Sequence, residues 1–211
     1  MSLTLVGKKK GMVQVFDENG HVVIGTVIEI EPNVVIQIKT KDNDGYGAVQ
    51  LGSQKKKNVT KPLKGHFAKA NVDPKRYLKE SLVEKTEDYK IGQEICIDYF
   101  AEGDYIDIIG TTKGKGYQGV MKLHGFHGGP AAHGSGFHRH AGSTGMRSTP
   151  GRCLPGGKRA SRMGGNKSTA QNLKIAFIDA EKKLLVVKGS VPGNKGGDVY
   201  VAKSKKKKQV K

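Results

Sequence analysis

Apolar and polar residues alternate with a period of two along most of the first hundred residues, which is the pattern of half-buried β-strands. Further alternating segments follow near residue 100 and in the last forty residues. The pattern predicts strands at residues 12–16, 21–30, 34–40, 46–51, 94–100, 105–111, 173–178, 183–188 and 198–202. Asp17-Glu18-Asn19-Gly20 has the Asn-Gly sequence typical of a hairpin turn, and residues 42–45 predict a second turn. We therefore expect a mainly β protein.

Helical patterns are scarce in this sequence. Short helical turns are expected at residues 66–71 and at residues 75–79, where Pro74 suits a first helical position. A third is expected at residues 116–123.

The predicted strands lie on both sides of a long segment without strand character. We expect residues 94–111 and 173–202 to pair in one closed β-barrel, since closure leaves no exposed strand edge. The predicted domains are a discontinuous barrel over residues 1–112 and 171–204, an inserted loop over residues 113–170 and a basic tail over residues 205–211. A loop this long is uncommon inside a compact domain unless it has a function.

The composition of the central segment indicates what that function is. Residues 108–178 contain eleven Lys or Arg, five of the seven His and sixteen Gly, but no Asp or Glu. Residues 121–174 contain no Val or Ile, so few side chains are suited to strand packing. Such a segment repels itself in water and becomes ordered against a dense negative partner. Nucleic acid phosphate is the partner that these residues predict.

The rest of the composition narrows the class of protein. The net charge is +18, of which the central segment contributes +11. Cys96 and Cys153 lie far apart in different settings, which favours a reducing compartment without a disulfide. The first fifteen residues do not have the order of a signal peptide, and no apolar run is long enough to span a membrane. We expect a soluble, intracellular, cytoplasmic protein.

The histidines of the central segment allow a metal site as one alternative, because two histidines three residues apart can share an ion. No acidic residue lies nearby, however, and the glycines give the ligands no rigid frame. Stacking on bases or donation to phosphates is the favoured role for these histidines. No metal, cofactor or small-molecule substrate is expected.

Nucleophilic catalysis is a second alternative, through Cys153 or a serine beside a histidine. The carboxylate that usually orients such a histidine is missing from the segment. The arginines are instead spread along the loop, as expected for a chain that threads between phosphates. A charged linker would usually mix both signs, so a purely solvated role is less favoured. We expect no enzyme activity.

A set of motifs is spread along the chain in a pattern that matches a known family. One block contains Phe100, Asp107, Gly110, Thr112, Gly114-Lys115-Gly116 and Gly119. Matching motifs elsewhere are Lys8-Lys9-Lys10-Gly11-Met12, Phe16-Asp17, Lys61-Pro62-Leu63-Lys64-Gly65-His66, His124-Gly125-Phe126, Phe137-His138-Arg139, Gly142-Ser143-Thr144-Gly145, Thr149-Pro150-Gly151-Arg152 and Lys188-Gly189-Ser190-Val191-Pro192-Gly193. Together these motifs resemble the L-three family, the third protein of the large ribosomal subunit. The resemblance covers essentially the whole chain, and the length suits the bacterial or organellar form.

The resemblance implies a translation-factor-like closed β-barrel with a long, irregular loop rich in Gly, Arg and Lys. It implies a structural constituent of the large ribosomal subunit that binds large-subunit (23S-type) rRNA near its 3′ end early in assembly. It also implies that the loop runs towards the peptidyl transferase centre, and that neighbouring large-subunit proteins are partners. A DNA-compacting protein is the competing class, because a high positive charge and a Lys tail also suit DNA.

Fourteen residues are expected to contact rRNA, all of them basic or imidazole side chains of the loop. They are Lys113, Lys115, Lys122, His124, His127, His138, Arg139, His140, Arg147, Arg152, Lys158, Arg159, Arg162 and Lys167. Two positions depart from the family pattern. Leu123 stands where relatives commonly have Arg, which moves or removes one phosphate contact. Ser148 stands where some bacterial members have a methylated Gln, so that modification is not expected.

Overall fold

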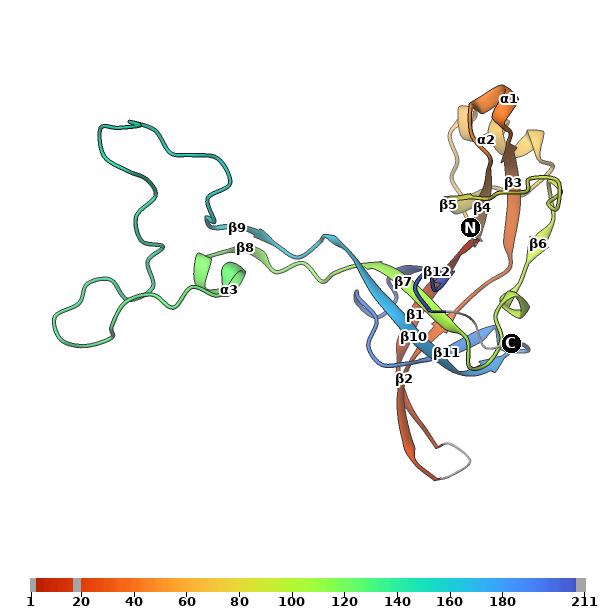
Figure 1. Ribbon diagram of the computed structural model, residues 1–211. Coiled ribbons are helices and arrows are strands. Elements are labelled where there is room, and N and C mark those ends of the chain that lie inside the picture. Colours follow the sequence, from red (N-terminus) through yellow and green to blue (C-terminus); the bar gives the residue numbers. More distant parts are fainter. Residues whose placement is uncertain (1–2, 17–19, 208–211) are drawn as a thin grey trace. The chain divides into compact units, whose positions relative to one another are not determined.

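Six antiparallel strands form a closed ring in the computed structural model, which describes residues 3–16 and 20–207 (Figure 1). The order around the ring is β1-β12-β7-β10-β11-β2, and β2 pairs back with β1. The strands are β1 (Thr4–Phe16), β2 (Val22–Glu29), β7 (Tyr105–Thr111), β10 (Lys167–Asp179), β11 (Leu184–Lys188) and β12 (Asp198–Lys203). The antiparallel pairing of β1 with β2 agrees with the predicted hairpin, although Asp17–Asn19 of its turn lie outside the described residues.

Alternation along β7 shows how this sequence buries one face of a strand in the core. Ile106, Ile108 and Gly110 are buried, whereas the residues between them are partly exposed. Side chains at every second position point to one face of a strand, so a period-two pattern buries one face only. Gly110 is needed because a Cβ there would lie 2.8 Å from the Pro192 carbonyl oxygen. The mainly β class predicted from the sequence is confirmed.

A second, four-stranded sheet has the order β5-β4-β3-β6. It consists of β3 (Asn33–Lys39), β4 (Ala48–Lys55), β5 (Lys75–Leu82) and β6 (Glu94–Ile95). The prediction of one barrel that includes residues 94–111 is therefore wrong for its first part. The helices between β3 and β7 are α1 (Lys41–Asp44), α2 (Lys61–Lys69) and a 3₁₀ turn, η1 (Ile97–Tyr99).

Two local predictions in this region are wrong. Residues 75–79 form a strand rather than a helical turn, since Pro74 can precede either element and β5 pairs with β4 along its length. The expected strand at 94–100 is two residues long. The buried residues of this segment are Ile95, Ile97 and Phe100. Ile95 and Ile97 are two residues apart, as in a strand, but Ile97 and Phe100 are three apart, which suits the 3₁₀ turn that forms there.

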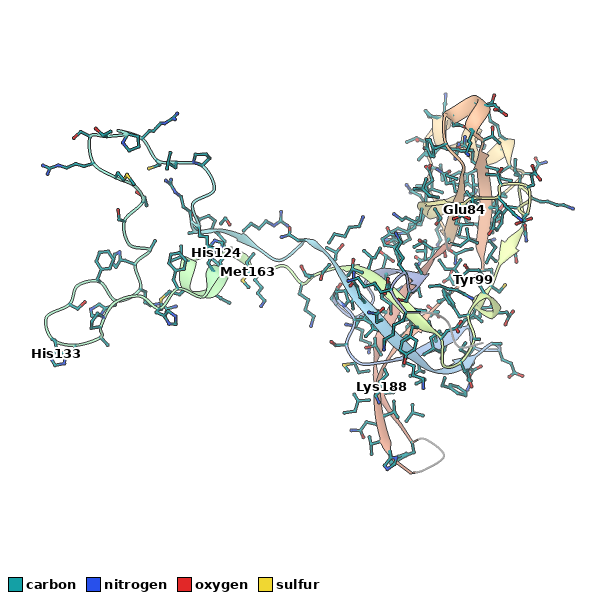
Figure 2. All side chains as sticks on the ribbon, viewed as in Figure 1. Glu84, Tyr99, His124, His133, Met163 and Lys188 are labelled. Atoms are coloured by element: carbon teal, nitrogen blue, oxygen red, sulfur yellow. The ribbon has the colours of Figure 1, made fainter. Side chains whose placement is uncertain are left out.

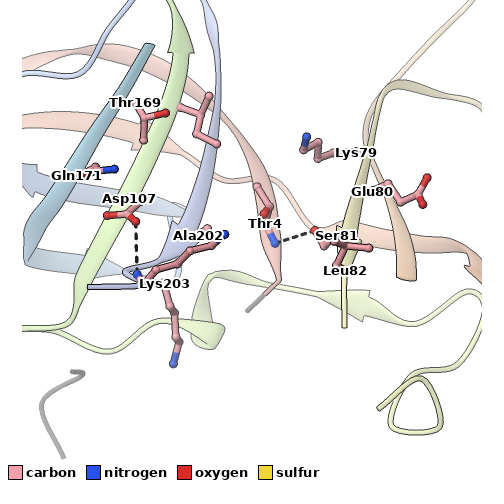
Figure 3. Close-up of a pocket in the computed structure, with 12 residues that line it drawn as sticks. Thr4, Lys79, Glu80, Ser81, Leu82, Asp107, Thr169, Gln171, Ala202 and Lys203 are labelled. Carbon is pink, nitrogen blue, oxygen red and sulfur yellow. Dashed lines mark hydrogen bonds between the residues drawn. The ribbon is translucent and has the colours of Figure 1, made fainter. Parts of the chain in front are cut away.

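Hydrogen bonds from buried side chains join β1 to the second sheet. The Val6 backbone N–H donates to Asn33 Oδ1 at 2.9 Å, and Asn33 Nδ2 donates to the Val6 carbonyl at 3.2 Å. The Thr4 N–H donates to Ser81 Oγ at 3.0 Å, beside a hollow of about 390 Å³ (Figure 3). Apolar residues of β1, β3 and β4, including Leu5, Val35 and Leu51, share one core.

Thr112–Asn166 form a separate compact unit, here called the inserted unit, while the described residues before and after it form the globular unit. The inserted unit contains β8 (Gly116–Gln118), α3 (Val120–His124) and β9 (Ser161–Met163). It ends four residues before the predicted end at residue 170, because residues 167–170 of β10 pair with β7. Of its residues, all of which the structure describes, only Val120 is buried.

Candidate nucleic-acid interface

Backbone hydrogen bonds close the base of the inserted unit. The Thr112 N–H donates to the Asn166 carbonyl at 2.9 Å, and the Gly165 N–H donates to the Thr112 carbonyl at 3.1 Å. One step further, the Lys115 N–H donates to the Met163 carbonyl at 2.9 Å. These bonds, followed by the β8–β9 pair, form a neck that fixes where the chain leaves and returns.

Glycine allows the two arms of the neck to approach. Gly164 has a φ of +72°, and a Cβ at this position would lie 2.1 Å from the Lys113 carbonyl oxygen. Only a residue without a side chain adopts this backbone at this separation without strain. The neck thereby presents Lys113 and Lys115 to solvent.

Thirteen of the fourteen predicted contact residues lie in the inserted unit. Lys167 is the exception, because it is the first residue of β10 in the globular unit. All fourteen side chains are exposed except His124, which is half-buried. Exposed cations suit a surface that meets a partner rather than one that holds the fold together.

The structure brings some of these residues together around three hollows. Arg139, His140, Lys158 and Arg159 line a hollow of about 600 Å³. His124, His127, His140 and Lys158 line a second hollow of about 410 Å³. Arg147 and Arg152 line a third of about 320 Å³. The predicted residues that line none of these hollows are Lys113, Lys115, Lys122, His138, Arg162 and Lys167.

The inserted unit has positive side chains but no negative ones to pair with them. Its sequence has nine Lys or Arg and no Asp or Glu, so its net charge is +9 and no ion pair can form inside it. In the globular unit, by contrast, lysines pair with carboxylates, as in Lys10–Glu29 at 2.8 Å and Lys39–Glu80 at 3.1 Å. A polyanion that displaces counterions is the natural complement of the inserted unit.

Two histidines hold the backbone of the inserted unit in place. His124 Nε2 donates to the Arg159 carbonyl at 3.0 Å, and His138 Nδ1 donates to the Pro130 carbonyl at 3.2 Å. His124, labelled in Figure 2, is the last residue of α3, and α3 contacts β9. Among residues 3–16 and 20–207, no three or more His, Cys, Asp or Glu side chains gather as a metal site would require.

Aromatic side chains at the site were not predicted from the sequence. Tyr117, Phe126 and Phe137 line the first two hollows between the basic residues. The signal that would have found them is the interleaving of aromatic and basic residues in a segment that has no core of its own.

Two further observations concern the cysteines and the helices. Cys96 and Cys153 are both free thiols, and Cys153 is exposed, with its Sγ 3.9 Å from Thr144 Oγ1. None of the helices in the described part of the chain is long and apolar enough to cross a membrane.

Comparison with known proteins gives matches over nearly the whole chain. A family model described as Ribosomal protein L3 matches residues 77–184. The chain is 55% identical to Large ribosomal subunit protein uL3 of Protochlamydia amoebophila (strain UWE25), covering 98% of this chain and 92% of the relative. It is 50% identical to the uL3 protein of Chlamydia muridarum, covering 96% of both chains. It is 52% identical to that of Borreliella burgdorferi (strain ZS7), covering 97% of this chain and all of the relative.

Proposed function

Because the chain belongs to the ribosomal protein L3 family, we propose that it is a structural constituent of the bacterial large ribosomal subunit and binds rRNA through its inserted unit. The relatives are named as large-subunit proteins. A protein of this family acts as a structural component of the cytoplasmic ribosome and not as an enzyme.

One observation carries the proposal that the inserted unit is the rRNA-binding part. The unit presents nine exposed cations without a single carboxylate, and it buries only Val120. Each cation that meets a phosphate releases condensed counterions, which is the main source of non-specific affinity for nucleic acid. The fourteen basic and imidazole residues predicted from the sequence are the proposed contacts.

The finer parts of the proposal rest on the family resemblance. We assign binding near the 3′ end of the large-subunit rRNA, early in assembly, with the inserted unit directed towards the peptidyl transferase centre. The globular unit, whose closed ring we liken to the β-barrel of translation factors, would then contact neighbouring large-subunit proteins and the rRNA surface.

Sucrose-gradient fractionation tests the proposed function. The full chain with an affinity tag is expressed in the cells that make it, and lysates are separated after a high-salt wash. We expect the tagged chain to migrate with large subunits in about one copy per particle. Recovery with DNA, or at the top of the gradient, would contradict the proposal.

A further inference from the structure

The second hollow of the inserted unit is built from rings. Its lining includes Phe126, Phe137, His124, His127 and His140, together with Lys158. The Phe137 and His140 ring centroids are 5.1 Å apart with an angle of 36° between the planes, and those of His124 and Phe126 are 6.2 Å apart. Five rings therefore face a space of about 410 Å³.

These rings have no apolar core to complete. Phe137 is 51% exposed, and Phe126 is half-buried. Burial of a phenylalanine side chain normally stabilises a fold, and a half-exposed ring forgoes much of that stabilisation. The arrangement is better explained by a ligand that covers the rings than by packing within the chain.

Glycines hold the two arms of the hollow at close range. The Gly129 N–H donates to the carbonyls of Phe137 and His138 at 2.9 and 3.1 Å. A Cβ on Gly129 would lie 2.6 Å from the Phe137 oxygen, and one on Gly128 would lie 2.3 Å from the His138 oxygen. The backbone thus positions Phe137 opposite the arm that carries Phe126.

The combination of ring faces and a cation matches one kind of RNA group. Bases in a duplex are stacked inside it, whereas an unpaired base can be turned out and stacked on aromatic or imidazole rings. Lys158 borders both this hollow and the adjacent 600 Å³ hollow, where Arg139 and Arg159 also lie, so a phosphate next to the base would meet positive charge.

We propose that this hollow receives an unpaired nucleobase of the RNA, stacked on Phe137 and Phe126, with its phosphate against Lys158. The proposal rests on the proposed rRNA-binding function and adds that part of the affinity is base stacking rather than charge. Stacking is nearly independent of salt, whereas phosphate contacts follow counterion release.

The test compares Phe137→Leu with Phe177→Leu in the full chain. Phe177 is a matched control, because it is 46% exposed, similar to Phe137, but belongs to β10 of the globular unit and does not line the hollow. Binding is measured on a transcript of the organism's own large-subunit rRNA at several salt concentrations. We expect Phe137→Leu to weaken binding about ten- to a hundredfold at every salt concentration, with an unchanged salt slope. Phe177→Leu should bind like the wild type.

Two further variants separate stacking from charge and from misfolding. Phe137→Tyr keeps the ring and should restore affinity to near the wild-type value. Lys158→Gln should reduce the salt slope by about one. In the complex, 2′-hydroxyl acylation should show one or a few unpaired nucleotides that the wild type protects and Phe137→Leu exposes.

The outcomes distinguish this inference from the proposed function. Wild-type affinity of Phe137→Leu, or an acylation pattern identical to that of the wild type, would overturn the stacking site and leave rRNA binding intact. Failure of Phe137→Tyr to restore binding would also overturn it. Failure of the wild type to bind the transcript would overturn both.

Discussion

Asn33 is a single residue on which the join between β1 and β3 depends. It is fully buried, accepts the Val6 N–H, and donates to the carbonyls of Val6 and Glu31. Asn33→Ala would leave these backbone groups buried without a partner, and we expect a loss of about 2–3 kcal/mol in the free energy of unfolding. Urea denaturation measures this. The exposed Asn43→Ala should change stability by less than about 0.5 kcal/mol, and equal effects would contradict the assigned role.

Glu80 gives the globular unit a dependence on pH. A hydrogen bond from the Tyr46 hydroxyl lowers the pKa of the Glu80 carboxyl, partial burial opposes this, and Lys39 lowers it further. A lowered folded-state pKa adds stability above the ordinary glutamate value of about 4.3, and this stability is lost as the pH falls through the folded value.

Glu80→Gln should therefore be less stable than the wild type at pH 7. The difference should shrink as the pH falls below the ordinary glutamate value of about 4.3, and it should vanish once the pH is below the lowered folded-state pKa, because the wild-type carboxyl is then protonated in both states. Urea midpoints from pH 7 to pH 3 provide the measurement, with the exposed Glu87→Gln as control. A difference that stays constant down to pH 3 would refute the assigned coupling.

Gly164 and Gly114 form a matched pair in the neck of the inserted unit. Gly164 has a positive φ and no room for a Cβ, whereas a Cβ added to Gly114 would meet nothing within 4 Å. We expect Gly164→Ala to open the neck and reduce incorporation into large subunits severalfold, while Gly114→Ala is incorporated normally. Thermal unfolding of the globular unit should be the same in both variants. Quantification of each variant in the large-subunit peak decides the comparison.

At the scale of elements, the sequence predicted those strands whose alternation is regular. The bounds of β7 were predicted as observed, and β11 and β12 were predicted to within one residue. β5 was missed because Lys75, Arg76, Lys79 and Glu80 hide its pattern, and its stability comes from pairing with β4. Cross-strand pairs of this kind join residues distant in sequence and leave little local signal.

The start of β10 was also missed for a physical reason. Its first residues, Lys167 to Ala170, contain no large apolar side chain, yet they pair with β7 from Thr111 to Ile108. The strand is extended there by its partner rather than by its own propensity. The true boundary changes where a deletion should be placed.

Removal of residues 113–165 with a short Gly-Ser bridge should leave a folded globular unit. Thr112 and Asn166 remain hydrogen-bonded, and the shorter connection favours folding by about 2 kcal/mol in closure entropy. A matched deletion that extends to Ala170 removes four strand pairs and should unfold at a lower temperature. Scanning calorimetry compares the two. Loss of cooperative unfolding in the shorter deletion would show that the inserted unit completes the core.

The sequence predicted which charged residues the candidate site contains, but it did not predict how those residues are arranged in space. The basic and imidazole residues were identifiable because no carboxylate accompanies them. Their grouping around hollows depends on the packing of Gly128 and Gly129 against residues 137–138, which has no periodic signal. For the same reason Phe126 and Phe137 could not be assigned to a shared surface from the sequence.

At the scale of the whole molecule, the inserted unit and the rest of the chain have the same net charge but different charge per residue. The inserted unit carries +9 on 55 residues, and the remaining 156 residues carry 28 basic and 19 acidic side chains, which is also +9. The described part of the tail is anchored to the globular unit, where Lys207 Nζ lies 4.2 Å from the Tyr105 ring centre. Because the two parts have equal net charge but unequal charge density, removal of the same number of charges from each part can test which property accounts for rRNA binding.

The last prediction compares two variants that each lose four positive charges. In the first variant, Gln replaces Arg139, Arg147, Arg152 and Arg159. In the second variant, Gln replaces the four lysines Lys205–Lys208, of which Lys208 lies outside the described residues. Each charge-assisted hydrogen bond lost to a phosphate in the assembled particle costs about 1.5–3 kcal/mol. Exposed lysines of a tail contribute mainly screened attraction. We expect the arginine variant to fail to give salt-stable large subunits and the lysine variant to assemble nearly normally, as measured by gradient profile and protein content of the large-subunit peak. Equal defects would mean that total charge, and not the inserted unit, accounts for binding.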